Sequence, residues 1–127
     1  MRRSLPDRRL RDLRPDPVKG FLQRLGEIAG RDPDAARWAQ ALVAELEQED
    51  AERCSGLVAT LRAYYASGAR VDKTAEVLFL HRNSVRYRLD RIRLLTGLDI
   101  DRPDVVAAMT VALGCRATIT EERIDAG

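Results

Sequence analysis

Residues 71–93 read VDKTAEVLFLHRNSVRYRLDRIR, and this stretch decides the expected fold. Apolar residues recur at helical spacing on both sides of a short break near His81, which predicts two helices joined by about three residues. Ala75 is a small residue at the point where two such helices cross closely, and Val85 and Leu89 fall on the inward face of the second helix. This arrangement is typical of a helix-turn-helix.

The sequence before this pair predicts two more helices, over residues 17–29 and 33–48. The apolar stripe of the first consists of Val18, Leu22, Leu25 and Ile28. The stripe of the second helix contains Trp38, which we expect in the core or in a dimer interface. The polar cluster at 49–53 predicts a break or kink after this helix.

Capping residues outline the remaining helices. Ser55 is the expected cap of the helix before the pair, and Asp72 is the expected cap of the first helix of the pair. The last helix begins at Pro103 and is expected to end at Gly114, because glycine favours helix ends. No stretch alternates apolar and polar residues as a strand does. The sequence therefore predicts an all-α fold, a helix-turn-helix with additional N-terminal helices.

Charge is distributed unevenly along the chain, although the formal net charge is only +2 at pH 7. Residues 1–14 hold six Arg against two Asp, residues 32–54 hold seven acids against two Arg, and residues 70–93 hold seven bases against three acids. A basic segment between acidic ones favours a surface that meets a polyanion, but solvated helix faces give the same pattern. The acids of 45–52 lack the pattern of a calcium loop, so we interpret them as a solvated helix face.

The outward face of the second helix of the pair carries the candidate chemistry. A helix fits the major groove of DNA with its N-terminal residues facing the base edges, where Arg pairs with guanine and Asn with adenine. Ser and Tyr side chains donate to phosphates, and the start of the preceding helix is a second expected phosphate contact. We expect His81 both to cap the helix and to touch DNA. The candidate DNA-binding residues are Lys73, Thr74, His81, Arg82, Asn83, Ser84, Arg86, Tyr87 and Arg88. Arg91 and Arg93, further along, are expected near the DNA backbone.

Residues 78–100, LFLHRNSVRYRLDRIRLLTGLDI, resemble the signature of the C-terminal DNA-binding region of PucR/CdaR-like transcription regulators. The likeness covers about residues 50–117 and implies a fold related to the Fis-type helix-turn-helix, with the DNA-reading helix at about 82–96. It implies the contact positions His81, Arg82, Asn83, Ser84, Arg86 and Tyr87. The expected organisation is a basic arm and helical segment for dimerisation at 1–50, a PucR-type helix-turn-helix DNA-binding domain at 51–117, and a frayed tail at 118–127.

The leading hypothesis is a sequence-specific DNA-binding transcription regulator that acts on double-stranded DNA as a homodimer. Helix-turn-helix proteins commonly dimerise, which places two recognition helices in successive major grooves about 34 Å apart. The N-terminal helices are the candidate dimer surface, because the C-terminal core looks complete without them. The alternative is a helical protein–protein interaction module that does not bind DNA.

Other function classes find little support in the residues. His81 is the only histidine and no nucleophile or carboxylate stands in a triad-like arrangement with it, so we expect no enzyme. Cys54 and Cys115 stand far apart, which excludes a disulfide scaffold and a sequence-local zinc module, and no Gly-rich phosphate loop is present. We therefore expect no metal, no cofactor and no small-molecule site in this chain.

No apolar run approaches the roughly 20 residues of a membrane span, and no signal-peptide pattern follows the N-terminus. We expect a cytoplasmic protein without membrane contact. The residues before the likeness are too few for the long sensory region that such regulators usually carry. The operator, the inducer and the sign of regulation do not follow from these residues.

Overall fold

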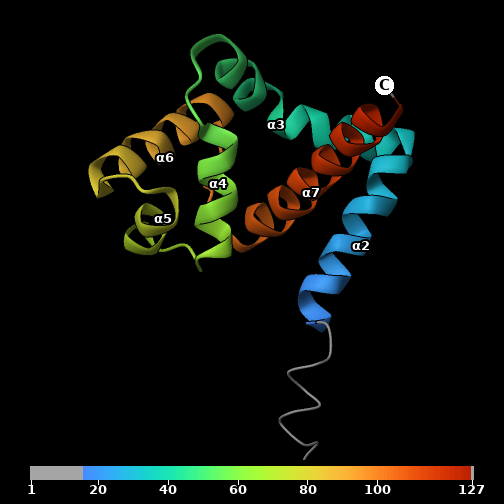
Figure 1. Ribbon diagram of the computed structural model, residues 1–127, viewed down its shortest axis with the longest axis horizontal. Coiled ribbons are helices and arrows are strands. Elements are labelled where there is room, and N and C mark those ends of the chain that lie inside the picture. Colours follow the sequence, from blue (N-terminus) through green and yellow to red (C-terminus); the bar gives the residue numbers. More distant parts are fainter. Residues whose placement is uncertain (1–15, 127) are drawn as a thin grey trace, which may run out of the picture.

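The computed structural model describes residues 16–126, and from residue 117 on it describes the backbone only. Within this range the chain forms six α-helices and no strand, which confirms the all-α prediction. The helices are α2 (Pro17–Arg31), α3 (Pro33–Arg53), α4 (Leu57–Ala66), α5 (Val71–Leu78), α6 (Arg82–Thr96) and α7 (Pro103–Ala126) (Figure 1). The basic stretch 1–14 lies outside the described residues. None of the helices in the described part is long and apolar enough to cross a membrane.

Figure 1 shows α5 and α6 at one end of the molecule and α2 at the other, with α4 and α7 between them. In agreement, α2 packs against α3 and α7, whereas α5 and α6 pack against each other and α4, and α6 also touches α3. The two ends of the molecule are therefore connected through a shared middle layer.

The connection between α5 and α6 spans the three residues Phe79 to His81, as predicted. Phe79 takes a left-handed conformation with φ 55°, and its amide donates to the carbonyl of Glu76 at 3.3 Å. The Leu80 amide donates to the carbonyl of Ala75 at 3.0 Å, which completes a Schellman motif. Glycine is the usual residue at this position, but here a phenylalanine occupies it with 95% of its surface exposed.

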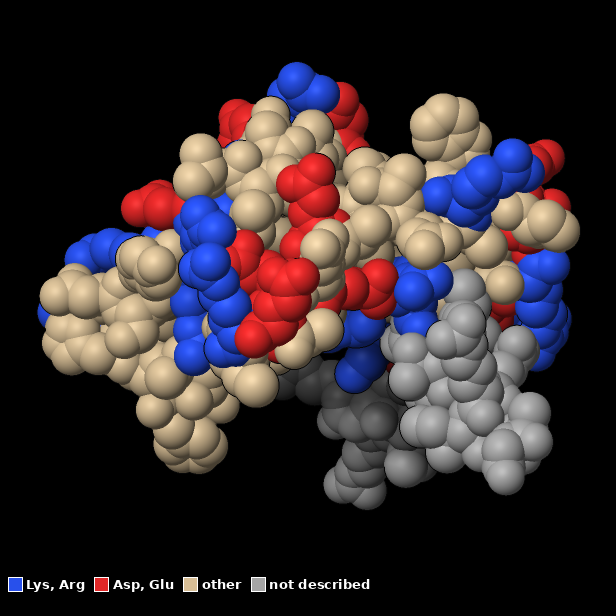
Figure 2. Space-filling view, turned by 90° about the horizontal axis from the view of Figure 1, so that it is seen from above, with Lys and Arg blue, Asp and Glu red and all other residues tan. Residues whose placement is uncertain are grey.

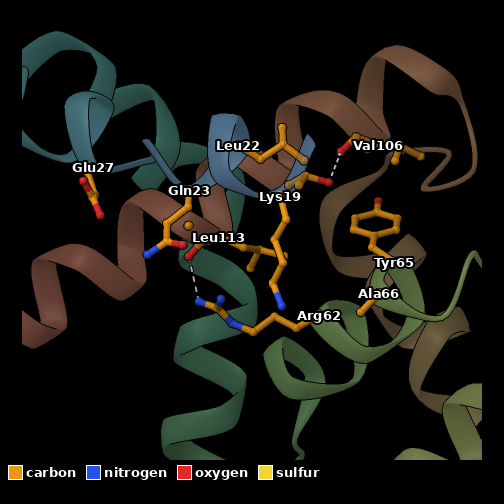
Figure 3. Close-up of a pocket in the computed structure, with 11 residues that line it drawn as sticks. Lys19, Leu22, Gln23, Glu27, Arg62, Tyr65, Ala66, Val106 and Leu113 are labelled. Atoms are coloured by element: carbon orange, nitrogen blue, oxygen red, sulfur yellow. Dashed lines mark hydrogen bonds between the residues drawn. The ribbon is translucent and has the colours of Figure 1, made fainter. Parts of the chain in front are cut away.

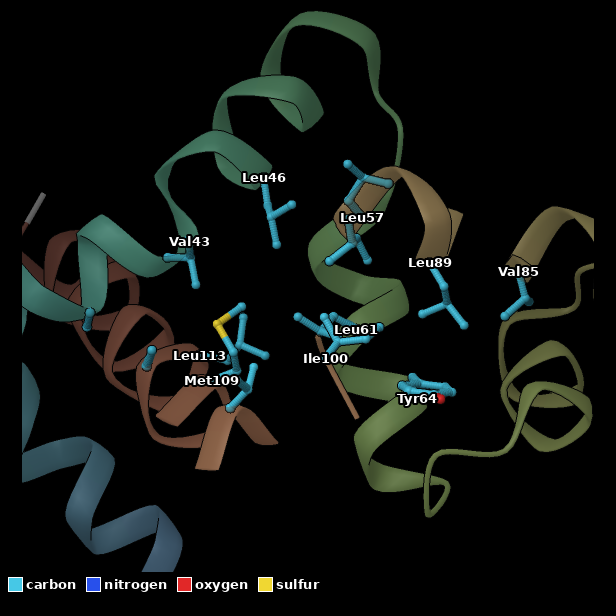
Figure 4. Packing of buried hydrophobic residues seen from close by; sticks show 14 of the residues in the cluster. Val43, Leu46, Leu57, Leu61, Tyr64, Val85, Leu89, Ile100, Met109 and Leu113 are labelled. Carbon is cyan, nitrogen blue, oxygen red and sulfur yellow. The ribbon is translucent and has the colours of Figure 1, made fainter. Parts of the chain in front are cut away.

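One cluster of buried apolar side chains joins α3, α4, α5, α6 and α7 (Figure 4). Val85, Leu89 and Ile92 of α6 are fully buried in it, and the first two confirm the predicted inward face. Val43 and Leu46 of α3 are also fully buried there. The expectation that the C-terminal core is complete without the N-terminal helices is therefore wrong for α3, whose second half forms one wall of that core.

The predicted break at 49–53 is the last turn of α3, which remains helical to its end. The carboxylate of Asp50 in this turn accepts hydrogen bonds from the backbone amides of Leu57 at 2.7 Å and Val58 at 3.1 Å. These amides belong to the first turn of α4 and have no partner within their own helix. Asp50 thus caps α4, and the prediction that Ser55 does so is wrong, since its hydroxyl donates to the Glu49 carbonyl instead.

The first helix of the pair also begins differently from the prediction. Arg70 is the N-cap residue of α5 and makes no side-chain capping bond, whereas Asp72 lies inside the first turn. Asp72 pairs with the guanidinium of Arg70 at 3.2 Å. Desolvation is the largest single influence on the pKa of Asp72 and raises it, but the hydrogen bond from the Lys73 amide and the positive charge of Arg70 together outweigh it and hold this pKa below its ordinary value. The carboxylate therefore supports the positive end of the helix dipole from within the helix.

The acids of 45–52 do not all form a solvated face, contrary to our interpretation. The side chain of Glu49 is 9% exposed and accepts hydrogen bonds from the Arg91 guanidinium, with Nη2 at 3.0 Å from both carboxylate oxygens. Glu47 pairs with Arg116 of α7 at 3.2 Å. Seen from above, acidic side chains in the middle of this face lie between basic side chains on either side (Figure 2). Part of the acidic segment therefore serves to hold α6 and α7 on α3.

The contact between α2 and α7 is made without side chains at its closest point. Gly26 of α2 faces Gly114 of α7, and a Cβ atom built on Gly26 would lie 3.1 Å from the Gly114 carbonyl carbon. The prediction that α7 ends at Gly114 is wrong, because the helix continues to Ala126 and passes the expected boundary at residue 118 without a break. A glycine inside a helix costs about 1 kcal/mol relative to alanine, and here its missing side chain permits a close helix crossing.

Only part of the apolar stripe of α2 is covered, since Leu22 and Leu25 are half-buried. Val18 and Ile28 are exposed, and the neighbouring Phe21 is 65% exposed, because the Gly26 side of the helix is the one that packs against α7. Trp38 of α3 is 76% exposed, so the expectation that it lies in the core is wrong. A helical period identifies an apolar face but not the surface that covers it.

Candidate DNA-binding interface

The first half of α6 presents a polar face that the core fixes in place. Val85 and Leu89 hold the inner side of the helix in the buried cluster. The exposed residues at the start of this helix, all of them predicted candidates, are His81, Arg82, Asn83, Ser84, Arg86 and Tyr87. These six lie within the seven residues 81–87, interrupted only by the buried Val85, at the N-terminal end of one helix. This is the end that faces base edges in helix-turn-helix complexes.

His81 is the N-cap residue of α6. Its Nδ1 accepts a hydrogen bond from the backbone amide of Asn83 at 3.0 Å. An imidazole nitrogen accepts only when it carries no proton, so the proton of the neutral ring lies on Nε2. The capping role predicted for His81 is confirmed, and its Nε2–H remains as a donor at the exposed start of the helix.

Arg86 and Asn83 lie one turn apart on the exposed face. The Nη1 atom of Arg86 stands 3.5 Å from the Asn83 side-chain oxygen, at the outer limit of a hydrogen bond. The contact brings two planar groups, a guanidinium and an amide, close to each other on the exposed face. The guanidinium presents two N–H donors side by side, and the amide presents one donor and one acceptor. Each of these arrangements can pair with the edge of a base.

The two candidates on α5 differ in their exposure. Lys73 is exposed, with its ammonium 3.7 Å from the carboxylate of Glu76. Thr74 is fully buried, and its hydroxyl donates to the carbonyl of Arg70 at 2.7 Å. The Lys73 side chain is therefore at the surface of the molecule, whereas the Thr74 side chain is not.

Arg88 is turned away from the other candidates. Its Nη1 donates to the hydroxyl of Thr60 on α4 at 3.2 Å, and it lies so close to Gly56 that a Cβ there would come within 2.6 Å of it. The hydroxyl of Thr60 in turn donates to the Gly56 carbonyl at 2.6 Å. Arg88 thus ties α6 to the start of α4, a role that no local sequence signal indicates.

Arg91 and Arg93, expected near the DNA backbone, are engaged within the protein. Arg91 holds Glu49 as described, and Arg93 pairs with Asp90 at 3.0 Å and with Asp101 at 3.2 Å. Because these acids neutralise the second half of α6, the positive charge that remains exposed lies at its beginning. Sequence reasoning missed Glu49 and Asp101, since neither stands near its partner in the chain.

Comparison with known proteins matches residues 57–115 to the PucR C-terminal helix-turn-helix domain. The uncharacterized protein in the pkwA 5' region of Thermomonospora curvata is 35% identical over 104 residues, which cover 82% of this chain and 53% of that protein. The purine catabolism regulatory protein of Bacillus subtilis is 32% identical over 78 residues, 61% of this chain and 14% of that regulator. The carbohydrate diacid regulator of Escherichia coli is 43% identical over 54 residues, 42% of this chain and 14% of that regulator. No solved structure matches the chain.

The matched residues begin at the start of α4 and extend into α7, so they contain α5, α6 and every candidate residue named above. The chain spans about half the length of the first of these relatives and a much smaller part of the two regulators. Residues 57–115 therefore belong to the family of PucR C-terminal helix-turn-helix domains, and the chain carries a DNA-binding domain of the kind found in transcription regulators.

Proposed function

We propose that this chain is a sequence-specific transcription regulator that reads the major groove of double-stranded DNA with α6, residues 82–96. One observation carries the proposal. The inner side of α6 packs into the core through fully buried side chains. The first two turns of the helix expose arginine side chains and an asparagine amide on the opposite side. A helix of this kind at the outer end of the molecule fits the groove without any rearrangement of the core.

The exposed side chains divide into two groups by their chemistry. Arg82, Asn83 and Arg86 have the planar forks that pair with guanine or adenine edges. Ser84, Tyr87, Lys73 and the Nε2–H of His81 are donors suited to phosphate oxygens, which fix the register of the helix in the groove. We leave Thr74 and Arg88 out of this contact set, because one is buried and the other faces α4.

We further propose that the regulator acts as a homodimer through the exposed apolar side chains of α2 and α3. Val18, Phe21, Ile28 and Trp38 leave an apolar surface that a second copy would remove from water. Since α2 and α6 lie at opposite ends of the molecule, we propose half-sites separated by more than one turn of DNA, in place of the single turn expected from the sequence.

The test is fluorescence anisotropy with a pool of random DNA duplexes, followed by selection of the bound fraction and titration with salt. We expect binding that weakens steeply with salt and enriches a palindrome. On the selected site, Arg86→Ala is expected to weaken binding about 5- to 150-fold, as the loss of one bidentate base contact does. The matched control is Arg37→Ala, which removes an exposed arginine of α3.

An unchanged affinity of the Arg86→Ala variant for the selected site would overturn the assignment of α6. The absence of DNA binding at low salt, together with a salt-insensitive association with another protein, would instead favour a protein–protein interaction module. The exposed apolar side chains of α2 and α3 are the observation that supports this second candidate function.

A further inference from the structure

A cavity of about 580 Å³ lies between α2, α4 and α7 (Figure 3). Its walls are mainly apolar and include Leu22, Tyr65, Val106 and Leu113. Sites for small molecules in proteins are typically concave, of about 300 to 1,000 Å³, and lined by apolar side chains with a few polar groups that orient the ligand. The cavity has this size and composition, so its polar groups decide which ligand it suits.

Two cationic side chains border the cavity, Lys19 from α2 and Arg62 from α4. Figure 3 shows the Lys19 ammonium extending toward the side on which Arg62 lies. The Arg62 guanidinium is fixed there, since Nη2 donates to the Leu113 carbonyl at 2.7 Å. A neutral carbonyl accepts this bond, so the positive charge of the group is not neutralised by it.

Arg62 is an exposed residue, but the protein atoms around its guanidinium remove part of the water that would solvate it. Desolvation lowers the pKa of this guanidinium from its ordinary value, and the negative charge of Glu47 raises it in part. A cation in such a place interacts more strongly with an incoming anion than it would in open water. The carboxylate of the cavity, Glu27, lies apart from Arg62 in Figure 3 and pairs with Arg24 at 3.4 Å.

Tyr65 supplies a flat wall. Its hydroxyl donates to the Ile100 carbonyl at 2.9 Å, which fixes the ring at the border of the cavity. A fixed aromatic ring favours an offset or edge contact with a second flat group. The cavity therefore combines an aromatic wall, aliphatic walls and two positive charges on one side.

We propose that this cavity binds a small organic acid with an aromatic body, whose anionic group pairs with Lys19 and Arg62. The expectation that the chain has no identifiable small-molecule site came from the absence of a local motif. The cavity has no such motif, because its walls come from residues of three helices that are far apart in the sequence.

A ligand in the cavity would contact α4, the helix that holds α6. Arg62 and Tyr65 lie on α4, and α4 holds α6 through the Thr60–Arg88 hydrogen bond. A ligand that fixes α2 against α4 is then expected to change the affinity for DNA, a step that rests on the proposed function. Binding of the acid itself does not rest on it.

The experiment uses two fluorescent probes of the same shape, with the full chain and no DNA. The probe 8-anilinonaphthalene-1-sulfonate is an aromatic anion, and N-phenyl-1-naphthylamine is its uncharged counterpart. We expect saturable binding of the anion at one site per chain, with affinity reduced about five- to tenfold in Lys19→Met, and an unchanged affinity for the neutral probe. Arg37→Met, the matched control on the exposed surface of α3, is expected to bind both probes as the unchanged chain does.

A second variant tests the location. Ala66 borders the cavity and is exposed, so Ala66→Trp is expected to fill the space without disturbing the core and to abolish binding of both probes. Circular dichroism shows whether each variant is folded. The proposal is overturned if the unchanged chain does not bind the anion saturably, if Lys19→Met binds both probes as before, or if folded Ala66→Trp still binds them. Since no DNA is present, these outcomes are independent of those that test the proposed function.

Discussion

The helices at the two ends of the molecule, α6 and α2, differ in which kind of residue they bury. At the α6 end, large aliphatic side chains such as Val85 and Leu89 are buried inward and the polar side chains point outward. At the α2 end, Gly26 is the buried residue of the helix and the apolar side chains of Val18 and Phe21 point outward. A helix that packs through large side chains, such as α6, leaves polar groups exposed at its start, whereas a helix that packs through a glycine, such as α2, leaves apolar side chains exposed. Exposed apolar side chains are present at the other end too, at Phe79 and Leu94.

The largest expected difference is between an apolar side chain buried in the shared core and one exposed at the α2 end. Leu61→Ala, in the centre of the shared core, is expected to lower the free energy of unfolding by about 2–5 kcal/mol. Ile28→Ala, on the exposed face of α2, is expected to change it by less than about 0.5 kcal/mol in dilute solution. Urea unfolding measures both, and repeating it at high protein concentration shows whether Ile28 contributes to a dimer. A loss in Ile28→Ala as large as in Leu61→Ala would contradict the comparison.

The next expected effect is a difference in stability between alanine variants at two glycines of α2. Gly26→Ala places a methyl group 3.1 Å from the backbone of α7, so α2 must move away, and we expect a loss of about 1–3 kcal/mol. A methyl group on Gly20 meets nothing within 4 Å, and Gly20→Ala is expected to gain about 0.5–1 kcal/mol, because alanine favours the helix. Thermal unfolding of the two variants provides the measurement. Equal effects would show that the close crossing of α2 and α7 does not form in solution.

A smaller effect is expected at the start of α6. His81→Ala removes the acceptor of the Asn83 amide and is expected to cost about 0.5–2 kcal/mol of stability. His81→Asn retains a capping oxygen and is expected to restore most of this loss while removing the Nε2–H donor. Urea unfolding and DNA anisotropy together separate the two roles. If His81→Asn recovers stability and DNA binding alike, His81 acts only as a cap.

The last effect appears only at alkaline pH, where α4 meets the start of α7. Burial, followed by the hydrogen bond to Asp101 at 2.6 Å, raises the pKa of Tyr64 from 10.0 to about 12. The folded state therefore favours the neutral phenol, so the stabilisation is complete below pH 10 and is lost as the pH rises from 10 toward 12. The urea midpoint followed between pH 9 and 12 is expected to fall less steeply in Tyr64→Phe. An equally steep fall in this variant would assign the dependence to another group.

The helix-turn-helix could be predicted from sequence because its signals are local. The periodicity of Val85 and Leu89, the small Ala75 and the short break near His81 all lie close to one another in the chain. Six of the nine candidate site residues stand together at the start of α6 for the same reason, and Lys73 is exposed nearby in the sequence.

The remaining features depend on partners that are distant in the chain. No local pattern shows that Glu49 receives Arg91, that Asp50 caps the next helix, or that Gly26 meets Gly114. Thr74 illustrates the same limit at the site, because a threonine near a helix start presents its hydroxyl either to a ligand or to its own backbone. The choice depends on which side of the helix the core covers.

The last turn of α3 holds two helices at once, α4 through Asp50 and α6 through Glu49. If this turn frays, the first amides of α4 lose their acceptor and α6 loses its ion pair in the same event. Adjacent segments that open together exchange their amide hydrogens with solvent at a common rate. Hydrogen exchange is therefore expected to group the end of α3, the start of α4 and the middle of α6 into one cooperative unit, although these segments lie up to some forty residues apart in the chain.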